Sequence, residues 1–190
     1  MNRVAFSLVT IVVTLFSAMP LMAQQKRLSP HETISSVIDG NRVMIVYGRP
    51  YTKNPRTGEV RKIWGGLVPY GKVWRTGADE ATLFITQQPL VIGGTTVAAG
   101  AYTLWTLPNE DGSAKLIINK QIGQWGVDPH EPSNAYDEKQ DLARVDLKND
   151  ALDQSVDQFT MAVQKNSAGG GLIKLSWEKM QFSVPFVVQK

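Results

Sequence analysis

The chain contains no cysteine and only two histidines, His31 and His130. The lack of cysteine excludes a disulfide scaffold, a thiolate metal site and a thiol nucleophile. Two histidines are too few for a zinc site built on several imidazoles. The sequence also lacks a Gly-x-x-x-x-Gly-Lys-Ser/Thr phosphate loop and a Gly-x-Ser-x-Gly nucleophile elbow. We therefore expect no metal, no cofactor and no catalytic nucleophile, and a non-enzymatic role is favoured.

The one long apolar run without charge lies at the N-terminus. Arg3 precedes Val4 to Phe16, and small residues with Pro20 lead to a cleavage position after Ala23. This order predicts a secretory signal peptide over residues 1–23. An uncleaved anchor is the alternative, because an apolar stretch of about 19 residues approaches the length that spans a bilayer. Pro20 interrupts the stretch and favours cleavage, so we expect a periplasmic or secreted chain, 24–190, without a stable membrane anchor.

Charge is distributed unevenly along this expected mature chain. Residues 47–75 hold seven lysines and arginines against Glu59 alone, whereas residues 131–157 hold eight carboxylates against three cations. Either the two segments face each other in the fold, or the molecule has one basic and one acidic face. Exported proteins rarely act on nucleic acid, and we expect no nucleic-acid partner.

The mature chain has β character and no convincing helical periodicity. Strand-forming runs at 33–38 and 42–47 flank Asp39-Gly40-Asn41, a strong hairpin signal. Further strands are expected at 81–86, 90–92, 95–97, 102–107, 114–119, 142–147, 156–164, 172–177 and 182–188. Turn signals crowd residues 48–72, and 123–138 form a long loop. This pattern predicts one all-β domain over 24–190, an antiparallel β-sandwich or flattened barrel of roughly 9–10 short strands.

Aromatic and cationic residues interleave between positions 47 and 82, a pattern that suits an anionic or sugar-like ligand. Arginine binds oxyanions with two parallel hydrogen bonds, and tyrosine or tryptophan stacks on rings. The alternative is structural: the aromatic rings fill the core, and the arginines bind carboxylates or backbone carbonyls.

Two other groups of polar residues have weaker chemical interpretations. Asp79 and Glu80 resemble an acid/base pair, but adjacent residues on a strand point to opposite faces, so we expect them not to converge. Residues 128–141 offer many oxygen donors of the kind that calcium prefers, yet their spacing is not that of an EF-hand. An acidic, solvated loop is the preferred interpretation there.

Several blocks of the sequence resemble an exported bacterial family catalogued as domain of unknown function 2911. They are Tyr47-Gly48-Arg49-Pro50, the run from Trp64 to Thr82, Ala98 to Leu104, Asn119, Asn134 to Asp137, and Leu175 to Glu178. The resemblance covers about Leu28 to Val188. Gly48 stands where the family usually has serine, and Asp79 where it usually has asparagine. The resemblance implies a periplasmic or secreted β domain without an assigned activity.

These observations favour a binding module for an anionic or carbohydrate-like molecule, or for a protein partner in the envelope. Arg49 and Arg75 would hold anionic groups, Tyr51 and Trp74 would stack, and Glu80 would orient an arginine. Further expected members of this site are Asn119, Tyr136 and Asp137. An alternative is an envelope hydrolase or isomerase with Asp79, Glu80 or Asp137 as acid or base. A purely structural module that presents an exposed edge or patch is a third interpretation.

Overall fold

We describe a computed structural model of the chain over residues 27–125 and 135–189. Nine strands form its framework, together with one 3₁₀ turn (η2, Glu138–Gln140). The strands are β1 (His31–Ile38), β2 (Asn41–Gly48), β3 (Ala78–Thr86), β4 (Leu90–Ile92), β5 (Thr95–Val97), β6 (Gly100–Pro108), β7 (Ala114–Asn119), β8 (Asp141–Lys165) and β9 (Gly171–Val188). The expected signal peptide lies outside the described residues. No helix in the described part of the chain is long and apolar enough to cross a membrane.

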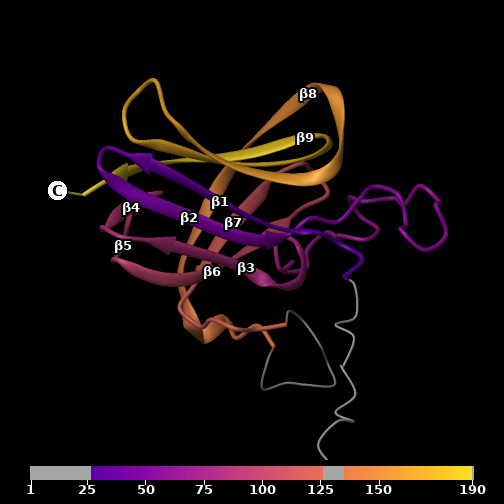
Figure 1. Ribbon diagram of the computed structural model, residues 1–190, viewed down its shortest axis with the longest axis horizontal. Coiled ribbons are helices and arrows are strands. Elements are labelled where there is room, and N and C mark those ends of the chain that lie inside the picture. The colour runs from indigo at the N-terminus through magenta and orange to yellow at the C-terminus, as the bar shows by residue number, and fades with distance from the viewer. Residues whose placement is uncertain (1–26, 126–134, 190) are drawn as a thin grey trace, which may run out of the picture.

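All strand pairs are antiparallel, and the order across the sheet is β1-β2-β3-β6-β7-β8-β9-β4-β5. The sheet is not closed, because β1 and β5 stand at its two ends. It folds over itself where β8 leaves β7 and continues beside β9 (Figure 1). The expectation of an antiparallel sandwich or flattened barrel is confirmed.

The hairpin between β1 and β2 forms as its sequence predicts. Ile38 pairs with Asn41, so Asp39 and Gly40 alone make the turn. Both have positive φ, 48° and 86°, as a two-residue type I′ turn requires, and its twist matches that of the strands. Buried and more exposed positions then alternate along β2, because successive side chains point to opposite faces of a strand.

The four strands expected in the last quarter of the chain are segments of two long strands. β8 has 25 residues and β9 has 18. The register between them shifts at two places, between Ala151 and Val156 and between Val156 and Thr160. Such bulges bend a strand without ending it. β8 therefore runs from β7 in one layer to β9 in the other.

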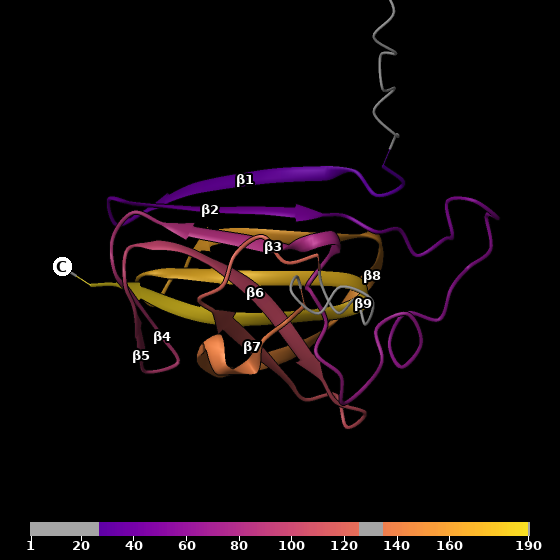
Figure 2. The ribbon, with the colours of Figure 1, turned by 90° about the horizontal axis from the view of Figure 1, so that it is seen from below.

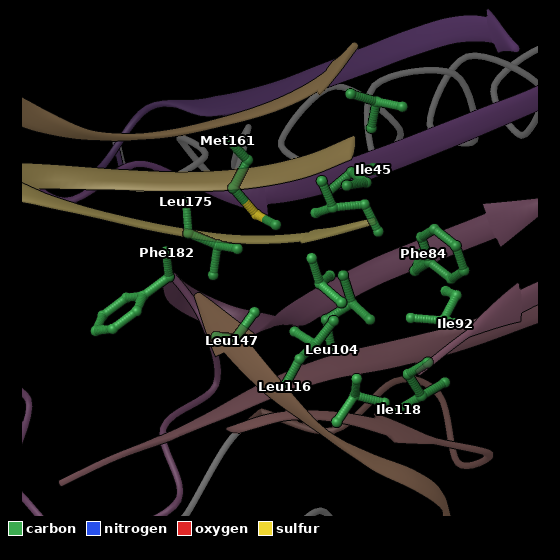
Figure 3. Packing of buried hydrophobic residues seen from close by; sticks show 14 of the residues in the cluster. Ile45, Phe84, Ile92, Leu104, Leu116, Ile118, Leu147, Met161, Leu175 and Phe182 are labelled. Atoms are coloured by element: carbon green, nitrogen blue, oxygen red, sulfur yellow. The ribbon is translucent and has the colours of Figure 1, made fainter. Parts of the chain in front are cut away.

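The core lies between the two layers and is built from the inward-facing residues of both. Ile45, Phe84 and Leu104 come from β2, β3 and β6, and Leu175 and Phe182 come from β9 (Figure 3). Each of these side chains is at most 2% exposed. Full burial of one such side chain contributes roughly 1.5–3 kcal/mol, so the core is the main source of stability.

Residues 49–77 connect β2 to β3 and project from the end of the molecule opposite the C-terminus (Figure 2). Backbone hydrogen bonds attach this segment at both ends. Thr52 N–H donates to the Asp157 carbonyl of β8 at 2.7 Å. Trp74 and Thr106 of β6 exchange two bonds of 2.8 and 2.9 Å. The connection is therefore anchored to both layers, and the start of the basic segment lies beside the end of the acidic one.

Tyr47 predicts a loss of stability at alkaline pH. Its ring is buried, its hydroxyl donates to Glu32 Oε2 at 2.9 Å, and Met161 N–H donates to the hydroxyl at 2.9 Å. Burial raises the pKa of Tyr47 from 10.0 to about 12. Because the folded-state pKa lies above the unfolded one, its contribution is complete below pH 10. It is lost as the pH rises from 10 through 12, by about 3 kcal/mol in all.

Urea unfolding at pH 8 to 12 tests this expectation against the variant Tyr47→Phe. The variant is less stable at neutral pH, because Glu32 and the Met161 N–H lose a partner. Its free energy of unfolding should fall less steeply than that of the wild type between pH 10 and 12. Parallel curves for the two proteins would contradict the assignment.

Candidate functional site

A cavity of about 240 Å³ lies where the connection 49–77 returns to β3. Pockets that enclose drug-sized ligands are roughly 300–1,000 Å³, so this one fits a smaller molecule. The residues around it come from the N-terminal approach to β1, the connection, the start of β3 and the middle of β9. They are Ser29, Pro50, Arg61, Leu67, Trp74, Arg75, Gly77, Ala78, Asp79 and Trp177.

Two tryptophans form the aromatic wall of the cavity. Trp74 stacks on Trp177 with ring centroids 6.0 Å apart and an interplanar angle of 22°. Phe159 and Trp64 contact Trp74 edge-on, at 5.0 and 6.3 Å. The Trp74 indole N–H donates to the Gly77 carbonyl at 3.1 Å. These contacts fix the Trp74 ring, so the wall is preformed.

Two guanidinium groups complete the wall, and backbone carbonyls hold both. Arg61 Nη2 donates to the Tyr51 carbonyl. Arg75 Nη1 donates to the carbonyls of Asp79 and Trp125, each at 2.6 Å. Arg61 Nε is buried and has no hydrogen-bond partner among the described residues. A buried donor without an acceptor is unfavourable by about 1–3 kcal/mol.

The backbone that carries these side chains adopts left-handed conformations at two residues other than glycine. Thr76 has φ 54° and Asp79 has φ 65°. Thr76 is fully buried, its hydroxyl contacts that of Thr106 at 2.8 Å, and its carbonyl accepts a bond from Thr82 Oγ1 at 2.7 Å. Such conformations persist where the surroundings enforce them, and they occur often at functional sites.

Asp79 and Glu80 converge, so the expectation that they point to opposite faces was wrong. Asp79 Oδ2 lies 3.0 Å from His31 Nε2, and Glu80 Oε2 lies 3.5 Å from the same atom. The positive φ of Asp79 interrupts the regular pleat of β3. The alternation of faces holds only for extended backbone, and it fails here for that reason.

Glu80 binds an arginine, Arg27, which is not one of the two arginines expected in the binding site. Arg27 Nη1 and Nη2 donate to the two oxygens of the Glu80 carboxylate, at 2.5 and 2.6 Å. This hydrogen-bonded cation lowers the pKa of Glu80 below its ordinary value. Glu80 is therefore ionised at neutral pH, which disfavours its use as a general acid.

Of the expected binding residues, Trp74 and Arg75 line the cavity, whereas Arg49 and Tyr51 do not. Arg49 pairs with Glu32 at 3.1 Å and donates to Phe159 O and Thr160 Oγ1 at 3.1 and 2.8 Å. Tyr51 forms an isolated bridge with Gln158 of β8. The two residues thus attach the connection to β8, in agreement with the structural interpretation of the basic segment.

Asn119, Tyr136 and Asp137 form a second cluster, and none of them lines the cavity. Asn119 is fully buried, and its Nδ2 donates to the Asp137 carbonyl at 2.9 Å and to Asp141 Oδ1 at 2.8 Å. The Tyr136 hydroxyl donates to Asp141 Oδ2 at 2.6 Å, and desolvation raises the pKa of Tyr136. The Asp137 side chain caps η2. These contacts hold the chain before β8 in place.

The sequence analysis missed four residues that matter here, and one of them is Arg27, the partner of Glu80. Arg61 belongs to the basic segment, but its residue type alone did not distinguish it from six other cations. Trp177 stood within a block of the family resemblance without a role. His31 lies 48 positions before Asp79, and no local pattern connects them. The oxygen-rich residues 128–134 lie outside the described part of the chain.

The comparisons with known proteins name a family for this chain. No curated protein and no solved structure matches the chain. The family described as "Protein of unknown function (DUF2911)" matches residues 29–186. That range includes all of the cavity wall described above and every strand except the last two residues of β9. The chain belongs to the DUF2911 family.

Proposed function

We propose that the chain is an exported binding protein whose cavity takes a small anionic ligand with a sugar-like ring. The observation that carries this proposal is the pair of arginines, Arg61 and Arg75, in the wall of a cavity that Trp74 also lines. Export is part of the proposal and rests on the expected signal peptide over 1–23.

The two arginines supply the preference for an anion. Carbonyl groups hold the side chains of Arg61 and Arg75 in place, so binding does not have to order them. Hydrogen bonds that involve a charged group contribute roughly 1.5–3 kcal/mol. A carboxylate at this wall would therefore gain both charge attraction and directed bonds.

The aromatic wall supplies the preference for a ring. Trp74 is partly buried and lines the cavity, so its ring presents an apolar surface suited to the C–H face of a sugar. The fully buried Trp177 packs against it and fixes its orientation. Leu67, another wall residue, is 44% exposed and marks the open side. The cavity volume of about 240 Å³ limits the ligand to the size of a single sugar ring.

Calorimetric titration with matched acidic and neutral sugars tests the proposal. Glucuronate and galacturonate should bind, whereas glucose and galactose should bind at least about tenfold more weakly, because they lack the carboxylate. Inorganic phosphate and sulfate show whether the anion alone is sufficient. If no member of this set binds, the small-ligand proposal is overturned and an envelope protein becomes the favoured partner.

A series of arginine-to-glutamine variants locates the binding site. Arg61→Gln should weaken uronate binding by about 10- to 100-fold, and Arg75→Gln should act in the same direction. Arg56→Gln is the matched control, because Arg56 belongs to the same connection but is exposed and outside the cavity wall. Melting temperatures show whether each variant is folded. Equal binding by Arg61→Gln and Arg56→Gln would place the ligand elsewhere.

A further inference from the structure

Three possible metal ligands gather beside the cavity, at the start of β1 and β3. The strand register brings them together: His31 pairs with Gly48 of β2, and Gly48 pairs with Ala78, the residue before Asp79. A Cβ atom on Gly48 would lie 3.1 Å from His31 Nε2 and 2.2 Å from the Ala78 carbonyl oxygen. Gly48 therefore leaves room for the imidazole to reach across β2 to Asp79 and Glu80.

The distances from His31 Nε2 to the two carboxylates match those of ligands that share one metal ion. His31 Nε2 lies 3.0 Å from Asp79 Oδ2 and 3.5 Å from Glu80 Oε2, and the donor atoms of the three residues lie within 4.8 Å of one another. Two ligand atoms about 2.1 Å from an ion are about 3.0 Å apart at a right angle and about 3.4 Å apart at a tetrahedral angle. The triad needs little rearrangement to coordinate an ion.

A cationic nitrogen of the chain already lies where these donors converge. Arg27 Nη1 is 2.5 Å from Glu80 Oε2, 2.7 Å from His31 Nε2 and 4.0 Å from Asp79 Oδ2. The arrangement places conflicting demands on His31 Nε2. This atom must accept a hydrogen bond from Arg27, yet it must donate one to Asp79, and it can do only one of these. A metal ion removes the conflict, because it takes a lone pair from every donor.

We propose that His31, Asp79 and Glu80 bind one divalent transition-metal ion, Zn²⁺ or Mn²⁺, which displaces the Arg27 guanidinium. One imidazole and two carboxylates are a mixed nitrogen and oxygen set that suits these ions better than Ca²⁺, which prefers oxygen ligands alone. The ion's two positive charges balance the two carboxylates. Asp79 also lines the cavity, so the ion would stand at its edge. This site revises the expectation of no metal, and it does not depend on the sugar proposal.

Titration of chelator-treated protein with Zn²⁺, Mn²⁺ and Ca²⁺, without any sugar, tests the site. The wild type should bind one Zn²⁺ or Mn²⁺ per chain and bind Ca²⁺ at least about tenfold more weakly. His31→Ala and Asp79→Asn should each weaken Zn²⁺ binding by about tenfold or more, since each removes a ligand. Asp79→Asn keeps the shape of the side chain. It therefore tests the loss of a ligand even if His31→Ala also disturbs β1.

Arg27→Ala separates this proposal from adventitious binding to acidic groups. Loss of the competing guanidinium should tighten Zn²⁺ binding, and an unchanged affinity would overturn the displacement of Arg27 by the ion. Two matched controls, Glu59→Gln at an exposed carboxylate and His130→Ala at the second histidine, should bind as the wild type does. No ion bound by the wild type, or equal binding by His31→Ala, would overturn the site itself.

Discussion

Replacement of Trp177 by alanine is expected to lower the free energy of unfolding by about 3–5 kcal/mol. Trp177 is fully buried in β9, and its ring lies 6.0 Å from that of Trp74 and 5.7 Å from that of Phe159. Removal of the indole leaves an empty volume next to an existing cavity. The surrounding strands belong to two layers and can close that volume only in part. Urea unfolding at neutral pH measures the loss.

The matched control for this substitution is Val187→Ala on the same strand. Val187 is 50% exposed and its truncation creates no enclosed volume, so a change within about 0.5 kcal/mol is expected. The loss in free energy of unfolding for Trp177→Phe should lie between those of Trp177→Ala and Val187→Ala, because a smaller ring still fills part of the space. Similar losses for Trp177→Ala and Val187→Ala would show that the aromatic cluster is not a packing centre.

Gly170→Ala is expected to destabilise the protein by about 2–4 kcal/mol, for two independent reasons. Gly170 has φ 68°, a conformation that residues with a side chain rarely adopt. A Cβ atom at this position would also lie 2.1 Å from the Phe186 carbonyl oxygen. That contact is with backbone near the C-terminal end of β9, so it cannot be relieved by a rotation of a side chain.

The neighbouring Gly169 separates these two causes. It also has a positive φ, 100°, but a Cβ atom there meets no atom within 4 Å. Gly169→Ala should therefore have only the conformational cost, about 1–2 kcal/mol. The excess loss in Gly170→Ala is the cost of the contact with Phe186. If both variants unfold at the same urea concentration, the close approach at Gly170 does not matter.

The sequence predicts most of the fold because its signals are local. The Asp39-Gly40 turn fixes the register of β1 and β2, and alternating burial along β2 follows from the pleat. The joining of expected strands into β8 and β9 was not predictable in the same way. The bulges near Val156 depend on which residues of β9 stand opposite. That pairing is a long-range property, and the residues between 148 and 160 include neither glycine nor proline.

The candidate site was predictable only in outline. Aromatic and basic residues marked the connection 49–77, and Trp74 and Arg75 do line its cavity. The sequence could not say which arginines would be held against β8, as Arg49 is, and which would line the cavity, as Arg61 does. That difference depends on where tertiary packing places each side chain. The approach of His31 to Asp79 depends on the registers of two strand pairs and on one positive φ angle.

The continuity of β8 has a consequence for the response of the protein to ligands. Its first residues pair with β7 and the remainder pairs with β9. If one layer unfolds, the other therefore loses the part of β8 that pairs with its own strands. The layers are then expected to open together, in one cooperative transition. A molecule bound at the end that holds Arg61 would accordingly slow the exchange of amide hydrogens in β4 and β5, at the far margin of the sheet, as much as in the strands beside it.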